Sequence, residues 1–377
     1  MTRVRLPFIV IAALALILAA CGDQAPSTGA SQAASQAASQ PADESEAPAE
    51  SEPPASGAGR LATVQSRGNL ICGVNGALPG FSNIDTDGAA TGFDVDFCRA
   101  VAAAVLGDSE AVEYRALTAD QRGPALQTGE VDVLIRNTTW TVSRDTAWGL
   151  FAPTTFYDGQ AIMVHADVGA TSLADLAGAT ICVQTGTTTE LNLADAIRDL
   201  SPAAEPLTFA DIDPTYQAYE EERCDAVTSD RSQLVARRTG FADPSAHVIL
   251  DDVLSKEPLG PVAPLGDDQW FNVIKWTVFA TIEAEELGID STNVADTAAS
   301  SDNPVVQRFL GVTPSGADPF ESGLGLEADW VVDVISQVGN YAEIYDRNLG
   351  PSTAFDLDRG LNTLWTDGGL LYAPPYR

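Results

Sequence analysis

The sequence is poor in the residues on which metal sites and nucleophilic catalysis depend. Its 377 residues include only two histidines, His165 and His247, and only two lysines, Lys256 and Lys275. It contains no His-x-x-x-His pair, no Cys-x-x-Cys pair and no Gly-x-Gly-x-x-Gly run. Zinc sites, histidine-based triads and phosphate-binding glycine loops therefore have little support, and we expect neither a metal nor a cofactor.

Basic residues are also scarce. The chain carries 20 Lys and Arg against 53 Asp and Glu, a formal net charge of −33. Such a field repels nucleic acid and anionic membrane surfaces, so a DNA- or RNA-binding role is excluded. At 45% apolar residues the chain can still bury a core. A usual domain size of about 150 residues predicts two or three domains.

The first 20 residues have the pattern of an export signal. Arg3 and Arg5 precede an apolar run over residues 6–20, which is too short for a comfortable membrane span of about 20 residues. The run ends in Leu18-Ala19-Ala20-Cys21, which resembles the bacterial lipobox. We therefore expect a lipoprotein signal peptide over residues 1–20 and a lipid on Cys21. The alternative is an ordinary signal or anchor with a chance cysteine.

Residues 21–59 predict a disordered tether. From residue 24 onward they consist mainly of Ala, Ser, Gln, Pro, Glu and Gly, without aromatic or branched aliphatic side chains. Nothing in such a segment can offset the entropy lost on ordering. The tether would let a folded body range above a membrane surface.

Four cysteines remain once Cys21 is assigned to lipid. Export implies an oxidising compartment, where an even number of cysteines suggests disulfides. The pairing Cys72–Cys98 and Cys182–Cys224 keeps each bridge within one half of the folded body. The alternative is four buried free thiols.

From residue 60 onward, short apolar strands alternate with amphipathic helices in two successive series, which predicts an α/β fold with two lobes. Extended apolar runs at residues 160–164 and 259–263 bracket the second series and suggest two crossings between the lobes. The first lobe would then be discontinuous, with residues 60–161 and 262–377, and the second would hold residues 162–261. Near the C-terminus we predict helical patches at 305–310, 326–338, 340–347 and 355–364.

Several segments resemble the solute-binding proteins of amino-acid ABC transporters, in the polar amino-acid family. They are Gly-Phe-Asp-Val-Asp at 92–96, Ala-Leu-Gln-Thr-Gly-Glu-Val-Asp at 125–132, Arg-Asn-Thr-Thr-Trp-Thr at 136–141, Val-Gln-Thr-Gly-Thr-Thr at 183–188 and Arg-Cys-Asp-Ala-Val-Thr-Ser-Asp at 223–230. Residues 73–82 and 136–141 resemble the general L-amino-acid-binding subgroup. The match is colinear from about residue 62 to the C-terminus.

The resemblance implies a type II periplasmic-binding-protein-like clamshell with a two-strand hinge. It implies a non-enzymatic, extracytoplasmic component of an ABC importer, which binds a broad range of free L-amino acids in the interlobe cleft. A permease and an ATPase encoded elsewhere would take the solute, and the lipid anchor would hold the protein at the membrane. We expect a monomer. Two alternatives from other classes are a sensory binding module and an enzyme resembling arogenate or prephenate dehydratases.

A free amino acid needs a bidentate cation for its carboxylate and a buried acid for its ammonium. In the resembling family the arginine that matches Arg144 clamps the carboxylate. The alternatives are a solvated arginine, or one paired with Asp145 or Asp132. The position that matches Asp230 holds the ammonium, and its alternative is a helix N-cap, a role that Asp serves well.

The resemblance also implies further ligand contacts. Asn137 and Thr139 follow a predicted strand, where ligands of α/β sheets bind, and would contact the ammonium. The turn with Gly186, Thr187 and Thr189 would meet the carboxylate from the second lobe; its alternative is a plain capped turn. The remaining assignments stay open. Phe81 and Trp140 would either form walls for the ligand side chain or pack in the core. Arg136 would meet either an acidic group of the ligand or an internal Asp.

Overall fold

The computed structural model describes residues 59–313, 318 and 320–377. The predicted signal peptide, Cys21 and the predicted tether up to residue 58 lie outside the described residues. None of the helices in the described part of the chain is long and apolar enough to cross a membrane.

A first sheet is built from strands that come from two distant parts of the sequence. Its order is β5-β1-β6-β14-β7, with β1 parallel to β5 and β6, and with β14 antiparallel to β6 and β7. β14 follows the whole second sheet in the sequence, so the first lobe, which we define by this sheet, is discontinuous. The strands are β1 (Leu70–Val74), β5 (Val112–Ala116), β6 (Val133–Leu134), β7 (Gly149–Phe151) and β14 (Val262–Pro264).

Four helices and a small sheet complete the N-terminal part of the first lobe. They are α1 (Arg60–Arg67), α2 (Phe93–Leu106), α3 (Arg122–Thr128) and α4 (Val142–Ala147), with β2 (Ala77–Leu78), β3 (Ser82–Ile84) and β4 (Ala90–Thr91). α2 begins after Gly92 and ends at Gly107, whose left-handed backbone (φ 69°) caps the helix. Its middle is almost entirely buried, as expected for a helix that is apolar on most faces.

The second sheet, which defines the second lobe, has the order β10-β9-β11-β8-β12, with β13 also paired to β8. β9 is parallel to β10 and β11, whereas β8 is antiparallel to its partners. The strands are β8 (Phe156–His165), β9 (Thr180–Gln184), β10 (Glu205–Phe209), β11 (Ala226–Asp230), β12 (His247–Ile249) and β13 (Ser255–Leu259), and the helices are α5 (Thr188–Ala196), α6 (Ile212–Glu220) and α7 (Arg231–Arg238).

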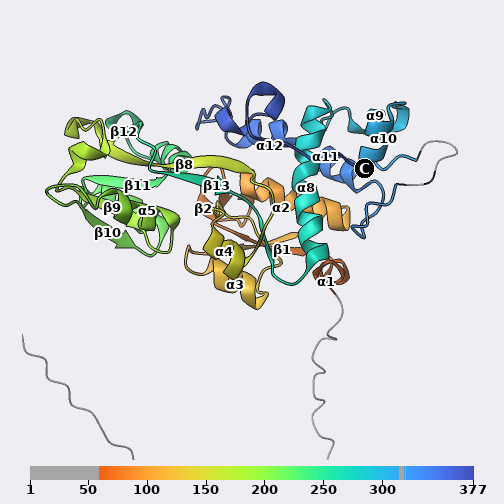
Figure 1. The fold of residues 1–377 in the computed structure, drawn as a ribbon, viewed down its shortest axis with the longest axis horizontal. Coiled ribbons are helices and arrows are strands. Elements are labelled where there is room, and N and C mark those ends of the chain that lie inside the picture. The colour runs from red at the N-terminus through yellow and green to blue at the C-terminus, as the bar shows by residue number, and fades with distance from the viewer. Residues whose placement is uncertain (1–58, 314–317, 319) are drawn as a thin grey trace, which may run out of the picture. The chain divides into compact units, whose positions relative to one another are not determined.

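Two short segments cross between the sheets and lie next to each other (Figure 1). Residues 152–155 join β7 to β8, and residues 260–261 join β13 to β14. The Ala152 N–H donates to the Pro261 carbonyl at 2.9 Å. The apolar run at 160–164 belongs to the interior of β8, where Ala161 pairs with Ser229, so the crossing begins earlier in the chain. The division of the chain at residues 161 and 262 stays a prediction.

The C-terminal part is helical and packs on the first lobe. It contains α8 (Asp268–Glu286), α9 (Val294–Ser300), α10 (Pro304–Phe309), α11 (Trp330–Gln337) and α12 (Tyr341–Asn348). α11 and α12 contact both α2 and α8, and Arg347 forms an ion pair with the buried Asp96 of α2 at 2.7 Å. The helix expected at 355–364 is wrong. Only a single turn at Gly360–Asn362 forms, because Asp356 and Gly360 adopt left-handed backbones.

Both predicted disulfides are present. Cys72 of β1 is bonded to Cys98 of α2, and Cys182 of β9 is bonded to Cys224, which precedes β11. All four cysteines are buried. Each bond ties elements of one sheet region together and leaves the two crossing segments as the covalent connection between the lobes.

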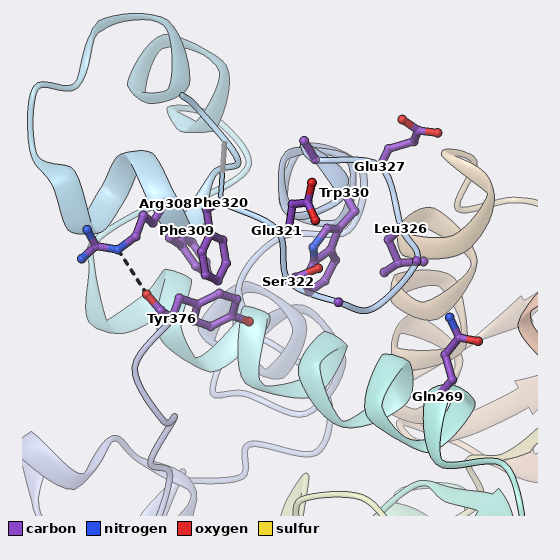
Figure 2. Close-up of a pocket in the computed structure, with 13 residues that line it drawn as sticks. Gln269, Arg308, Phe309, Phe320, Glu321, Ser322, Leu326, Glu327, Trp330 and Tyr376 are labelled. Atoms are coloured by element: carbon purple, nitrogen blue, oxygen red, sulfur yellow. Dashed lines mark hydrogen bonds between the residues drawn. The ribbon is translucent and has the colours of Figure 1, made fainter. Parts of the chain in front are cut away.

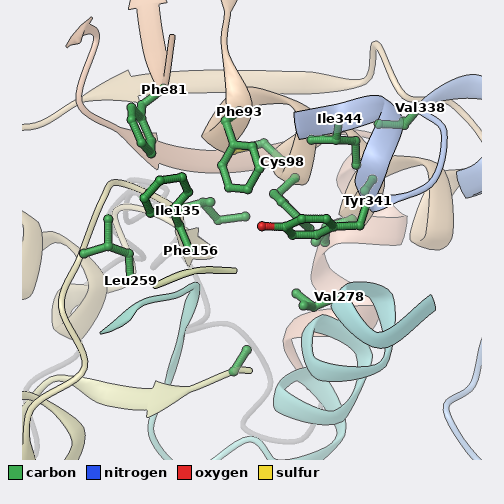
Figure 3. Close-up of a cluster of buried hydrophobic side chains, with 14 of the residues drawn as sticks. Phe81, Phe93, Cys98, Ile135, Phe156, Leu259, Val278, Val338, Tyr341 and Ile344 are labelled. Atoms are coloured by element: carbon green, nitrogen blue, oxygen red, sulfur yellow. The ribbon is translucent and has the colours of Figure 1, made fainter. Parts of the chain in front are cut away.

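The core of the first lobe is centred on Phe93. Its ring is fully buried and lies edge-on to Phe97, Phe156 and Tyr341, with centroid distances of 5.1, 5.9 and 5.8 Å. Figure 3 shows Phe93 and Tyr341 pointing toward each other from α2 and α12. Since Phe156 begins β8, the same cluster anchors the first crossing segment.

We therefore predict that Phe93→Ala lowers the free energy of unfolding by about 3–5 kcal/mol, the usual cost of removing a buried aromatic ring. Leu361→Ala, on a side chain that is 55% exposed, should change it by less than about 0.5 kcal/mol. Urea titration followed by tryptophan fluorescence measures both. Equal stability of the two variants would contradict the assignment of Phe93 to the centre of the core.

Candidate functional site

Arg144 is a buried guanidinium in the first turns of α4. The Thr141 hydroxyl caps this helix by accepting the Arg144 N–H at 3.3 Å. Nη1 donates to the Thr139 carbonyl at 3.1 Å, and the guanidinium lies over the Trp148 ring at 4.9 Å. Among the described residues it forms no ion pair within 4.0 Å. Pairing with Asp145 or Asp132 is therefore not what the structure shows.

Asp230 ends β11 and stands at the N-cap position of α7. It is only 5% exposed, and its side chain makes no capping hydrogen bond. Burial raises the pKa of its carboxyl well above the usual range. The neighbouring Asp158 and Glu257 raise it further, whereas Arg122 and Arg144 lower it. Asp230 also partly offsets the lowering of the pKa of Arg144 by burial, so the two groups act on each other electrostatically.

Two more buried arginines lie near Arg144. Arg122, at the start of α3, donates from Nη2 to the Gly186 carbonyl at 3.3 Å, and its Nε has no partner within the described part of the chain. Burial lowers the pKa of Arg122, and the positive charges of Arg144 and Arg136 lower it further. Arg136 donates to the Leu117 carbonyl at 2.8 Å and lies near the buried Asp94, which fits the internal-Asp alternative.

Carboxylates balance these cations. Burial raises the pKa of Asp94 to about 7, although the Asn137 N–H bond and Arg136 lower it. Burial also raises the pKa of Asp158 to about 6 against hydrogen bonds from Ser232 and Gly159. The third carboxylate, Glu257, is 1% exposed. Arg122 thus lies near Arg144 and Arg136, and Asp230 lies near Asp158 and Glu257, so like charges approach one another where they are buried.

Arg122, Asp158 and Glu257 are absent from the sequence-predicted set. Arg122 had one usable signal, because it lies three residues before the matched segment at 125–132. Asp158 and Glu257 lie on β8 and β13, two strands that are far apart in the sequence. Only the pairing of these strands, with Glu257 opposite Asp158, brings the two carboxylates together.

Thr139 contacts Arg144 and residues of the second lobe. Its carbonyl accepts Arg144, and its hydroxyl donates to Glu257 Oε2 at 2.6 Å and lies 3.2 Å from the hydroxyl of Thr188. Asn137 has a left-handed backbone (φ 32°), and its side-chain amide donates to Gln233 of α7 at 3.3 Å. Both residues therefore link the first lobe to the second.

The turn before α5 is largely occupied by its own hydrogen bonds. The Thr187 hydroxyl caps α5 by accepting the Glu190 N–H at 3.0 Å, and it donates to the Gln184 carbonyl at 2.7 Å. The Gly186 N–H donates to the Glu190 carboxylate at 2.9 Å. Thr189 is buried with its hydroxyl 2.9 Å from that of Thr187. The Thr187 side chain thus caps α5, and its role toward a ligand stays a prediction.

The two predicted aromatic walls have different environments. Phe81 is buried and packs edge-on against Phe93 and Phe156, which is the core-packing alternative. Trp140 is 41% exposed and stacks on Phe151 with ring centroids 5.8 Å apart.

A cavity of about 350 Å³ lies between the lobes beside Arg136, with walls from Asn75, Leu117 and Thr118 on one side and Gln184 and Asp211 on the other. A larger cavity of about 570 Å³ lies elsewhere, between α8, α10 and the segment before α11 (Figure 2). Its charged side chains, Arg308, Glu321 and Glu327, are not buried. By contrast, Arg136, which lines the smaller cavity, is a buried charge.

Arg144 and Asp230 do not line the cavity beside Arg136, but their chemistry suits a small molecule with separated charges. Arg144 offers a planar donor fork that suits a carboxylate, and Asp230 offers an acceptor for an ammonium. Within the residues that the structure describes, no group of three or more His, Cys, Asp or Glu side chains is placed to hold a metal ion.

Comparisons with known proteins identify the family and the fold. The bacterial extracellular solute-binding proteins, family 3, match residues 70–351. The general L-amino acid-binding periplasmic protein AapJ of Rhizobium johnstonii is 48% identical over 86% of this chain and 94% of its own length. The glutamate/glutamine/aspartate/asparagine-binding protein BztA of Rhodobacter capsulatus is 46% identical over 86% of this chain and 95% of its own. A solved ABC transporter periplasmic binding protein from Brucella ovis, with glutathione bound, is 47% identical, with a TM-score of 0.81, over 85% of this chain and 100% of that chain.

The chain belongs to the bacterial extracellular solute-binding proteins, family 3. Its fold is that of the type II periplasmic binding proteins, with a discontinuous first lobe and two crossing segments. Both the family and the fold predicted from the sequence are confirmed. The relatives are binding proteins of transport systems and not enzymes, so the non-enzymatic class is confirmed as well.

Proposed function

We propose that this chain binds free L-amino acids between its two lobes and delivers them to an ABC importer. The supporting observation is the burial of Arg144 and Asp230 without an ion-pair partner in the described residues. Burying a charge without an opposite charge beside it costs free energy. A zwitterion of fixed geometry would compensate both groups at once.

A broad range of amino acids follows from what these groups recognise. Arg144, Asp230 and Thr139 would hold the carboxylate and the ammonium, the parts that all amino acids share. The names of two relatives support the same range: AapJ is a general L-amino acid-binding protein, and BztA is named for four amino acids. Arg122 would add a second guanidinium beside the ligand, and the turn from Gly186 to Thr189 would close on it from the second lobe.

Delivery requires the protein to stay near a permease. Cleavage after residue 20 and a lipid on Cys21 would hold the folded body at the membrane through the tether of residues 21–59. The crossing segments would let the lobes close around the ligand, a change that ligand contacts with both lobes would favour. A permease and an ATPase encoded elsewhere would recognise the closed form.

Replacement of Arg144 tests the proposal directly. Arg144→Ala should weaken L-amino-acid binding by about 2–5 kcal/mol, because it leaves the ligand carboxylate buried and unpaired. Titration calorimetry after a thermal-shift screen of the twenty amino acids gives the measurement. Arg198→Ala, on a side chain that is 69% exposed, is the matched control. Unchanged affinity in Arg144→Ala would refute the site.

The raised pKa of Asp230 predicts that binding releases protons. In the free protein the carboxyl holds its proton to higher pH than an ordinary Asp, and a bound ammonium favours the ionised form. Affinity should therefore fall as the pH is lowered through the raised pKa of Asp230. Calorimetry in buffers of different ionisation enthalpy counts the protons released. Asp199→Asn, at an exposed position, should leave the count unchanged, and proton uptake on binding would contradict the role of Asp230.

The lipid anchor makes a separate prediction. In bacterial cells that express the full chain, Cys21→Ser should move the protein from the membrane fraction to the soluble extracytoplasmic fraction, because the acyl chains supply the membrane affinity. Its amino-acid affinity should stay that of the wild type. Membrane association that survives the substitution would rule out Cys21 as the anchor.

A further inference from the structure

Glu257 has no part in the binding scheme so far, although its carboxylate is among the most buried charges of the chain. It lies on β13, just before the second crossing segment, and is 1% exposed. Among the described residues it has no ion-pair partner within 4.0 Å. A carboxylate buried in this way must be satisfied by hydrogen bonds.

Four donors meet this carboxylate, two on each oxygen. Oε2 accepts the hydroxyls of Thr139 at 2.6 Å and Thr188 at 2.8 Å. Oε1 accepts Asn192 Nδ2 at 2.9 Å and the Ser255 hydroxyl at 2.5 Å. The carboxylate is therefore an acceptor on both sides, and its four contacts come from both lobes.

This arrangement sets the direction of the Thr139 hydroxyl. A hydroxyl has one proton to donate and two lone pairs that accept. Because the proton of Thr139 points to Glu257, only lone pairs remain for any other partner. The proton of Thr188 also points to Glu257, so neither hydroxyl can offer a proton to a bound molecule. The two hydroxyls therefore match an ammonium, which can only donate.

The backbone holds Thr139 in this place independently of its side chain. The Gly260 N–H donates to the Thr138 carbonyl at 3.1 Å, and the Trp140 N–H donates to the Pro258 carbonyl at 2.8 Å. The segment around Thr139 is thus clamped to the strand that carries Glu257. Removing either side-chain group should change the polarity of the site and leave the segment in position.

We propose that Glu257 is a positioning residue of the ligand site, which takes up the Thr139 and Thr188 protons and so turns the lone pairs of these hydroxyls toward the ligand ammonium. The inference rests on the proposed function and deepens it. Glu257 contributes to the recognition of amino acids through Thr139 and does not need to touch the ligand.

A double-mutant cycle tests whether Glu257 acts through Thr139. The variants are Glu257→Met, which has a similar length and no strong acceptor, Thr139→Val, which keeps the shape and lacks the hydroxyl, and the combination of both. Binding of L-glutamine and L-glutamate to the full chain is measured by calorimetry, and folding is checked by thermal unfolding. Thr139→Ser, which keeps the hydroxyl, and Glu205→Gln, at an exposed position, are controls.

We expect Glu257→Met to weaken binding about tenfold in the wild-type background, the usual scale for a hydrogen bond to a charged group. In the Thr139→Val background the same substitution should weaken binding less than about threefold, since the group through which it acts is gone. The affinity of Thr139→Ser should lie within about threefold of that of the wild type, because this variant keeps the hydroxyl and its hydrogen bonds. If Glu257→Met does not fold, the same cycle is run with Glu257→Gln.

An equal loss in both backgrounds would overturn the inference, because it would mean that Glu257 acts through its charge or through the fold. Wild-type affinity in Glu257→Met would overturn it as well. These outcomes leave the proposed function standing as long as Arg144→Ala loses binding. If the wild-type chain binds neither L-glutamine nor L-glutamate and no other amino acid stabilises it, the proposed function fails and the inference fails with it.

Discussion

The structure depends on charges that are buried between the lobes without ion-pair partners. Arg122, Arg136 and Arg144 approach Asp230 and Glu257 in a region where burial shifts pKa values more than any neighbouring charge does. Burial of a charge is unfavourable unless hydrogen bonds or an opposite charge compensate it. The fold around this region therefore has to offset the cost of burying these charges. A ligand that supplied opposite charges would lower that cost.

Rigid cores on both sides make this arrangement possible. The aromatic cluster around Phe93, together with Tyr341 of the C-terminal helices, fixes the start of β8 where the chain leaves the first lobe. The disulfide Cys182–Cys224 ties β9 to the strand that ends in Asp230. Asp230 thus sits at the end of a strand whose residues are all buried, and such packing keeps a binding group in position before a ligand arrives.

The crossing segments connect these cores and also take part in the site. Thr139 lies in the segment after β6 of the first sheet, yet the backbone bonds beside it attach it to β13 of the second, the strand that carries Glu257. Hinge, hydroxyl and carboxylate therefore form one local unit. A movement of the crossing segments would therefore also move Thr139 and Glu257, because the same few residues form both the crossing and this hydrogen bond.

Much of this protein can be predicted from its sequence. The periodicity indicates two α/β lobes, and the positions of the cysteines indicate both disulfides. The apolar run at 160–164, however, lies inside β8 and not at the crossing. These features depend on neighbours in the chain, where patterns of 2 and 3.6 residues and capping rules apply.

Other features were decided only by tertiary structure. Whether Phe81 lines a pocket or the core, whether Thr187 has a free hydroxyl, and where β8 begins all depend on what packs against each residue. The proximity of Asp158 to Glu257 comes from a strand pairing across 99 positions of sequence, the separation of residues 158 and 257. Such partners cannot be predicted from local sequence, because the burial and hydrogen bonding of a residue depend on side chains that the fold brings from elsewhere in the chain.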